Sequence, residues 1–396
     1  MKILHTADWH LGKHFEGTDF SLLDEQRKVL NRIVEIASEE AVDVVLIAGD
    51  IFDSYNPSAQ ARRLFYETVC ALSESGRFVV AIAGNHDSPD MLNAEIPLYL
   101  DRNIVVMGTP GDDLSVFRRQ SDDWNVMTSG QFLLLERGGE RLVLFLLPYA
   151  SEVRLREAIL SDSVELRAAE YVEKIAYLMN RQVPFQADRV IGVGHIFMDG
   201  GEESGSERQL MLGTAYRVPL SVVPAHFDFM LLGHLHRYQR LDEKVIYSGS
   251  IFPISAREVE RSPDKVVVIV DGDGAVETVP ILGPDRVAVL RFDSVDSALR
   301  EAEKHSETLV FLEIRVSALS SEEINRIKKA YGDNLIALKV TLPGLSAQEN
   351  QFDIKSMSHE EIFREFYREK YGEYPPDELV SVFLEMLDRT GDKLNP

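Results

Sequence analysis

Short apolar runs alternate with longer amphipathic segments over the first 110 residues. The runs at 2–7, 42–50 and 77–87 are apolar at successive positions, which is typical of strands buried on both faces of a sheet. Between them, apolar residues recur at helical spacing over 22–41 and 59–75. Strands alternating with helices predict an α/β fold whose strands run parallel.

The pattern becomes richer in strands after residue 110. Segment 132–149 predicts a hairpin that turns at Gly138 and Gly139, and 151–181 has helical spacing. A last hairpin is predicted over 265–281, around its "DGDG" stretch. Three further strands are predicted between these two hairpins, over 189–196, 227–236 and 244–251.

A Gly-Pro pair in "LGPDR" interrupts the pattern and predicts a domain boundary. We expect a main domain over 1–283, a small βαβαβ domain over 286–343, and a linker with two amphipathic helices over 344–396. An apolar stripe of this size on a terminal appendage indicates a partner-binding surface, although the helices could also fold back on their own domain. The stripe consists of Ile362, Phe363, Phe366, Leu379, Phe383 and Leu387.

Composition limits the function without deciding it. Hydrophobic residues make up 45% of the chain and charged residues 27%, as in a soluble globular protein, and the chain has one cysteine. No apolar stretch reaches the ~20 residues of a membrane span, so we expect a cytoplasmic location. The net charge of −23 argues against free-standing nucleic-acid binding, unless a local patch, bound cations or a basic partner compensates.

Polar residues with metal-binding side chains follow the ends of the predicted strands. Because the carboxyl ends of parallel strands lie at one edge of a sheet, we expect these side chains to meet. Carboxylate, amide and imidazole donors suit manganese, iron or zinc better than calcium. There are too many donors for one ion and enough for two, although any one of them alone would more often be a cap or a surface residue. The set is Asp8, His10, Asp50, Asn85, His86, Asp87, His195, His234 and His236.

His5 does not belong to this set, because it lies midway along the first predicted strand. We expect it to be a core histidine. Glycines at 49, 84, 194 and 233 precede donors or their loops, and they allow the sharp turns and close approaches that such a crevice needs.

Five motifs occur in a fixed order: D-x-H at 8–10, G-D at 49–50, G-N-H-D at 84–87, G-H at 194–195 and G-H-x-H at 233–236. Together they resemble the calcineurin-like metallophosphoesterase superfamily. The segments "HTADWHLG", "AGDIFDSYNPS" and "GHLHR" resemble, within it, the SbcD family of bacterial DNA-repair nucleases. The resemblance implies a layered β-sandwich flanked by helices, with a small capping domain and a helical tail.

The resemblance also implies roles for individual residues. Asp50 would bridge two divalent ions, with Mn²⁺ the expected metal. One ion would be held with Asp8, His10 and His236, and the other with Asn85, His195 and His234. The catalytic residue would be His86, which stabilises the transition state or protonates the leaving group. Asp87 would support the site by orienting His86 or a loop and would not be a ligand. Asp53 is a further supporting candidate, but it stands where archaeal and eukaryotic relatives carry a strand-positioning histidine, so that role is not carried over to it.

The function implied is a two-metal DNA nuclease of double-strand break repair and recombination. It would act as a 3′→5′ exonuclease on double-stranded ends and as a structure-specific endonuclease on substrates such as hairpins. The implied partners are an SbcC-type ATPase, bound through the C-terminal helices, and a second copy of the chain.

Two alternatives stay open at this point. One is a phosphodiesterase or phosphatase acting on a small phosphoester or a phosphoprotein. Against a protein phosphatase, "GDIFDS" lacks the Arg-Gly that follows the second aspartate motif in those relatives, and "GNHDS" stands where they carry G-N-H-E. The other is a structural subunit with little catalysis, which the intact donor set opposes.

Overall fold

The computed structural model describes residues 1–99, 101–121, 123–155, 164–205, 207, 216–283, 285–341, 364, 367, 374–376 and 379–380. The chain divides into two compact units, 1–315 with 319–340 and 316–318 with 341–396. All elements that carry the candidate site belong to the first unit. No helix in the described part of the chain is both long enough and apolar enough to cross a membrane.

The first sheet has six strands in the order β14-β13-β1-β2-β3-β4. Strands β1 to β4 are parallel to one another and completely buried, as the unbroken apolar runs predict. The β13–β14 hairpin extends the sheet beyond β1 in antiparallel fashion. The bounds are β1 (Ile3–Thr6), β2 (Val44–Ala48), β3 (Phe78–Ile82), β4 (Ile104–Met107), β13 (Val266–Val270) and β14 (Val276–Pro280).

The second sheet has eight strands in the order β11-β12-β10-β9-β8-β7-β6-β5. Strands β7 and β8 form the predicted hairpin, and both turn glycines have positive φ, 59° at Gly138 and 88° at Gly139. Strands β8, β9, β10 and β12 are parallel. The bounds are β5 (Arg119–Gln120), β6 (Asn125–Ser129), β7 (Phe132–Arg137), β8 (Glu140–Leu147), β9 (Arg189–His195), β10 (Phe229–Gly233), β11 (Gln239–Arg240) and β12 (Val245–Tyr247).

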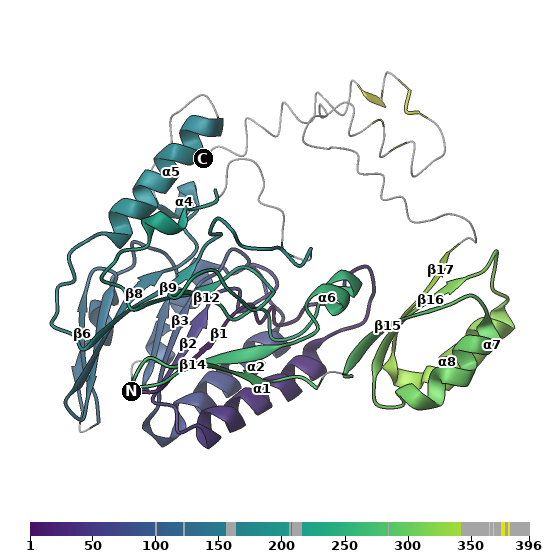
Figure 1. The fold of residues 1–396 in the computed structure, drawn as a ribbon, viewed down its shortest axis with the longest axis horizontal. Helices are drawn as coiled ribbons and strands as arrows, with labels where there is room; N and C mark the ends of the chain where they lie inside the picture. Colours follow the sequence, from purple (N-terminus) through teal and green to yellow (C-terminus); the bar gives the residue numbers. More distant parts are fainter. Residues whose placement is uncertain are drawn as a thin grey trace. The chain divides into compact units, whose positions relative to one another are not determined.

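The two sheets pack face to face with helices on their outer faces (Figure 1). One core cluster joins side chains of both sheets, among them Val44 and Val193. Helices α1 (Leu23–Glu39) and α2 (Ala59–Ser73) cover the outer face of the first sheet, and α5 (Val164–Met179) covers that of the second. The predicted layered sandwich flanked by helices is therefore confirmed.

The remaining helices of this region are short. They are α3 (Pro89–Ala94), α4 (Glu152–Leu155) and α6 (Ala256–Arg261). Of the helix predicted over 151–181, the structure describes α4 and α5, while 156–163 lie outside the described residues.

A three-stranded sheet follows, with the predicted βαβαβ order. It comprises β15 (Val287–Phe292), α7 (Val295–Glu301), β16 (Leu309–Arg315), α8 (Ser321–Tyr331) and β17 (Leu335–Thr341). Arg286, just before β15, pairs with Glu25 of α1. Residues of this module up to Val340 cluster with the large domain in one compact unit, apart from 316–318, and a separate domain over 286–343 stays a prediction.

The C-terminal stripe can be placed at one position. Leu379 is 40% exposed. The other residues of the stripe lie outside the described part: Ile362, Phe363, Phe366, Phe383 and Leu387.

Candidate metal centre

Every predicted donor lies at or just beyond the carboxyl end of a buried parallel strand. Asp8 and His10 follow β1, Asp50 follows β2, and Asn85 follows β3. In the second sheet, His195 is the last residue of β9, and two more donors follow β10, His234 and His236. The same edge of both sheets thus supplies the site, as the strand-end argument predicts.

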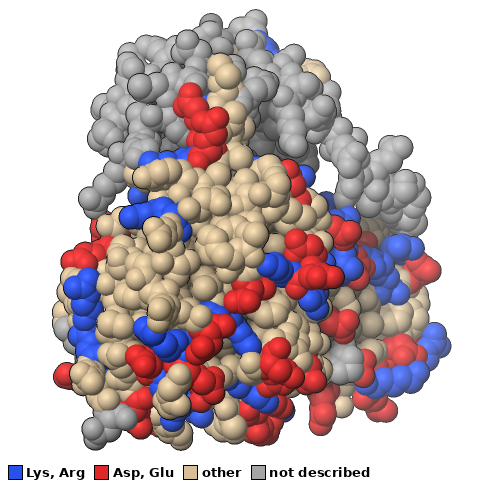
Figure 2. Space-filling model, turned by 60° about the vertical axis from the view of Figure 1, so that its left-hand side comes forward, with Lys and Arg blue, Asp and Glu red and all other residues tan. Residues whose placement is uncertain are grey.

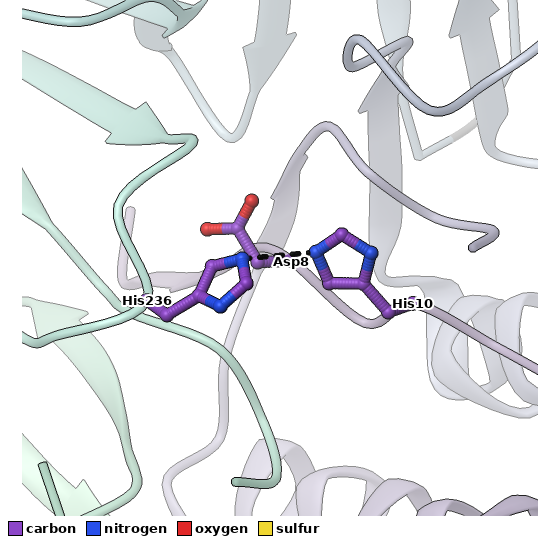
Figure 3. Close-up of side chains that lie close together, drawn as sticks. All are labelled: Asp8, His10 and His236. Carbon is purple, nitrogen blue, oxygen red and sulfur yellow. Dashed lines mark hydrogen bonds between the residues drawn. The ribbon is translucent and has the colours of Figure 1, made fainter. Parts of the chain in front are cut away.

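The first group of donors consists of Asp8, His10 and His236, whose ligand atoms lie within 4.8 Å of one another. Figure 3 shows the two imidazoles pointing toward each other beside the carboxylate, with His10 Nε2 3.0 Å from His236 Nε2. The Oδ2 atom of Asp50 is 3.6 Å from His10 Nε2. These four side chains converge on one point.

A second group surrounds the amide oxygen of Asn85. This Oδ1 lies 2.9 Å from His195 Nε2 and 3.0 Å from His234 Nδ1. The other ring nitrogen of His195 faces the Ala48 carbonyl at 2.8 Å, which leaves Nε2 to face the site. Because Asp50 Oδ2 is also 3.5 Å from His195 Nε2, this carboxylate lies between the two groups.

The donor set fits divalent cations. Asp8 and Asp50 are 1% and 2% exposed, and burying carboxylates is costly unless positive charge compensates. Burial lowers the pKa of His234 to about 3, so its imidazole is neutral and able to coordinate a cation. Imidazole nitrogens that face one another, with carboxylate and amide oxygens around them, are the donors that manganese, iron and zinc accept.

Backbone strain is concentrated at the same residues. In the described part of the chain six non-glycine residues have positive φ, and apart from Ala41 and Ser75 they are Asp8 (53°), His10 (44°), Asp50 (49°) and His234 (101°). Such conformations cost about 1–3 kcal/mol each and persist where the surroundings impose them, often at functional sites. Four of the candidate donors therefore have strained backbones.

Hydrogen bonds join the loops that follow β1, β2 and β10. The N–H of Asp8 donates to Gly49 O at 3.0 Å, and the N–H of His10 donates to Asp50 O at 2.9 Å. The N–H of His234 donates to Asp8 Oδ1 at 2.9 Å. Each loop therefore positions a neighbouring loop that carries another donor.

Comparison with known proteins agrees with this geometry. The family model of calcineurin-like phosphoesterases matches residues 1–238, which include every donor described above. The chain belongs to the calcineurin-like phosphoesterase family. The prediction of a metal-dependent phosphoester hydrolase is thereby confirmed, and divalent metal ions are its cofactors.

Relatives narrow the position within the family. The SbcD component of the SbcCD nuclease from Bacillus subtilis is 36% identical, and the match covers 98% of this chain and 97% of the relative. The SbcD component from Staphylococcus epidermidis is 26% identical, and the match covers 99% of this chain and 100% of the relative. That from Rhodobacter capsulatus is 32% identical, and the match covers 75% of this chain and 73% of the relative. The predicted resemblance to SbcD is confirmed.

His86 lies at the open side of this phosphoesterase site. Its side chain is 12% exposed, and its backbone N–H donates to Asp50 Oδ1 at 2.8 Å. Ring nitrogen Nδ1 lies 2.8 Å from the carbonyl oxygen of Asp53, an arrangement that fixes the imidazole and leaves Nε2 available.

Asp87 links the loops that follow β2 and β3. Its carboxylate accepts the backbone N–H groups of Gly84, Ile51 and Phe52 at 2.8, 3.1 and 2.8 Å. Burial, assisted by the charge of Asp50, raises the pKa of Asp87 to about 6. The side chain joins the loop after β2 to the loop after β3.

Arg154 of α4 is a contributor that the sequence did not reveal. Its guanidinium donates to the carbonyl oxygens of Gly84 and Asp87, each at 2.7 Å. These two carbonyls flank the Asn85–His86 dipeptide. The guanidinium also lies 5.2 Å from the ring centroid of Tyr149. Arg154 therefore clamps both ends of the segment that carries a metal donor and the catalytic candidate.

Replacing Arg154 by Met is expected to lower the turnover of a phosphodiester about 100-fold, since misplacing reacting groups by ~1 Å costs that much. Steady-state kinetics would measure it, with Arg63→Met as the matched control because Arg63 lies on α2 with its side chain 78% exposed. Turnover that is equal in both variants would refute the clamp.

Glu258 of α6 is a second contributor missed from the sequence. Its Oε2 lies 3.6 Å from His236 Nδ1, and its carboxylate also accepts hydrogen bonds from Ser250, Lys265 and the Ile254 N–H. Burial alone would raise the pKa of Glu258, but Lys265 and His236 hold it well below its usual range. A carboxylate behind a ligating histidine fixes the ring and strengthens the ligand.

The sequence around Glu258 concealed this role. Ser255 and Glu258 match the capping-box pattern of a helix N-terminus. The Ser255 hydroxyl does accept the Glu258 N–H at 3.1 Å. The glutamate side chain also pairs with Lys265 and faces His236, which the local capping pattern does not indicate.

Glu258→Ala is expected to cost about 3–5 kcal/mol of unfolding free energy, because it leaves Lys265 buried without its carboxylate partner. Urea denaturation would measure this loss. On the same helix, Glu260 pairs with Arg291 at the surface with its side chain 42% exposed, so Glu260→Ala should cost less than about 1 kcal/mol. Equal losses in the two variants would contradict the assignment.

Proposed function

We propose that the chain is a two-metal DNA nuclease, acting as a 3′→5′ exonuclease on double-stranded ends and as a structure-specific endonuclease in double-strand break repair and recombination. The observation that carries the proposal is the position of Asp50 Oδ2 between donors of the two sheets, 3.6 Å from His10 Nε2 and 3.5 Å from His195 Nε2. Relatives named as components of a nuclease, one of them 36% identical over 98% of this chain, support DNA as the substrate.

In this proposal Asp50 would serve both of two Mn²⁺ ions. Asp8, His10 and His236 would hold one ion with it, and they form the group in which the facing ring nitrogens lie 3.0 Å apart. Asn85, His195 and His234 would hold the other, and they form the group centred on the Asn85 amide oxygen.

The chemistry follows from this arrangement. Divalent ions bound here would activate a water near neutral pH and neutralise charge on the phosphoryl oxygens. The protein's own acid is His86: its Nδ1–H donates to the Asp53 carbonyl, and Nε2 delivers a proton to the departing sugar oxygen. A positioned acid matters because an alkoxide is a poor leaving group.

The surface charge affects the affinity of the chain for DNA. On the face drawn in Figure 2, basic and acidic side chains alternate around an uncharged area, and the described residues form no continuous basic surface there. With a net charge of −23, the isolated chain should bind duplex DNA weakly and lose activity steeply as salt rises.

A basic or ATP-driven partner would compensate. An SbcC-type ATPase bound through the C-terminal stripe is the partner proposed, together with a second copy of this chain. Leu379→Asp combined with Phe383→Asp should abolish copurification with the ATPase and leave hydrolysis of a small phosphodiester unchanged. Retained copurification would refute the role of the stripe.

The nuclease assignment is tested with linear duplex DNA labelled at one end, Mn²⁺ and the purified chain. Stepwise shortening from the 3′ end that stops on chelation is expected. Hydrolysis of a small phosphodiester or a phosphoprotein, with every DNA substrate left intact at low salt and in the presence of the ATPase, would favour the alternative phosphodiesterase or phosphatase.

A further inference from the structure

One large aromatic ring is exposed beside the buried site. Tyr55 lies in the loop between Asp50 and α2, and it is 55% exposed. Most of the donors are buried, whereas Asn85 and His86 are half-buried, so these two residues mark where a substrate reaches the site. The question is what an exposed ring contributes in the loop next to that opening.

Two contacts tie the Tyr55 loop to the Asn85–His86 segment. Two residues before Tyr55, the carbonyl oxygen of Asp53 lies 2.8 Å from His86 Nδ1. At Tyr55 itself, Nη2 of Arg154 donates to the tyrosine hydroxyl at 2.9 Å and to the Asp87 carbonyl at 2.7 Å. Since one nitrogen bonds both oxygens, the hydroxyl of Tyr55 lies close to the residue that follows His86.

The ring is held and yet remains accessible. The Arg154 guanidinium lies 5.8 Å from its centroid, and the hydroxyl is fixed, but more than half of the residue's surface is still open. A fixed aromatic ring beside a phosphodiester site is suited to stacking on a nucleobase, an interaction that tolerates any sequence because every base has a π-face. Fixing the ring in advance lowers the entropy cost of that contact.

We propose that Tyr55 is a nucleobase platform that stacks on a base of the substrate strand next to the scissile phosphate, with Arg154 holding the ring in place. The proposal rests on the proposed nuclease function and adds a contact with the base to a site otherwise built for the phosphate. A purely structural Tyr55 would show no dependence on whether that base is present.

The test crosses Tyr55→Ala with removal of the base. Wild type and variant are assayed on labelled duplexes whose 3′ strand is intact or carries one abasic residue, placed in turn at each of the last three positions. On intact DNA the variant should raise KM about tenfold, the size expected of one stacked base. When the abasic residue is at the position of the stacked base, the KM of the wild type should rise by the same factor. The KM of the variant should not rise further on that substrate.

Two further variants and one salt series sharpen the result. Tyr55→Phe keeps the ring but loses the hydroxyl that Arg154 holds, so it should raise KM less than Tyr55→Ala does. Tyr177→Ala removes a 67% exposed tyrosine from α5 and should have no effect. The ratio of variant to wild-type KM should be the same at low and high salt, because stacking, unlike phosphate contacts, releases no counterions.

Each other outcome is decisive. If the increases in KM caused by Tyr55→Ala and by base removal multiply when the two are combined, Tyr55 does not stack on that base. Such a result would overturn the platform without affecting the nuclease function. An equal loss of turnover on DNA and on methyl p-nitrophenyl phosphate would assign Tyr55 to positioning His86 and would also overturn it. A wild-type chain that hydrolyses the small ester and cuts no DNA would overturn the nuclease function itself, and the platform with it.

Discussion

Asp50→Asn is expected to lower phosphodiester turnover at least about 1,000-fold, a loss of ~4 kcal/mol in transition-state stabilisation. The reason is geometric. Oδ2 of Asp50 is the atom that faces both donor groups, 3.6 Å from His10 Nε2 and 3.5 Å from His195 Nε2. An amide keeps the volume and removes the charge that both cations would share.

The measurement is hydrolysis of a small phosphodiester at saturating Mn²⁺, with circular dichroism to show that the variant is folded. Asp90→Asn is the control, because Asp90 lies exposed on the nearby helix α3. A folded Asp50→Asn protein that keeps more than a tenth of wild-type turnover would show that this carboxylate does not bridge.

Gly84→Ala should be nearly as damaging, although it replaces no donor residue. A Cβ at position 84 would lie 2.1 Å from the backbone nitrogen and from Oδ1 of Asp50, so the loop after β2 must move. A shift of ~1 Å in a catalytic group costs about 100-fold in rate, and overpacking a site of this kind costs about 1–3 kcal/mol of stability.

Gly111→Ala is the matched control, since nothing lies within 4 Å of a Cβ added there. Thermal unfolding and turnover measured side by side would separate the two effects. If Gly84→Ala behaves like Gly111→Ala in both, the close approach of the β2 and β3 loops is not required for the site.

The part of the site that could be predicted from the sequence is the part set by strand ends. An apolar run that stops at a glycine and a donor fixes both the strand and its boundary, and parallel strands bring their ends together. The same reasoning separated His5 from the donors. His5 is fully buried in β1 with Nε2 3.1 Å from the Leu232 carbonyl, and burial lowers its pKa to about 4.

What could not be predicted depends on contacts between residues far apart in the chain. The sequence around Arg154 has only helical spacing, which does not indicate that its guanidinium reaches the Gly84 and Asp87 carbonyls. Glu258 matched a local capping pattern, and only the packing of Lys265 beside it shows its second role. The positive φ angles of Asp8 and Asp50 likewise arise from crossing loops, because the residue types alone do not favour them strongly.

Counting bound metal shows whether two cations bind at this site through the shared carboxylate of Asp50. Equilibrium dialysis of the purified chain against Mn²⁺, followed by elemental analysis, should give two ions per chain. Asp50→Asn should lower the affinity of the chain for both ions, while His234→Ala should lower its affinity for one. One ion in the wild type, or a count that Asp50→Asn leaves at two with unchanged affinity, would contradict the account.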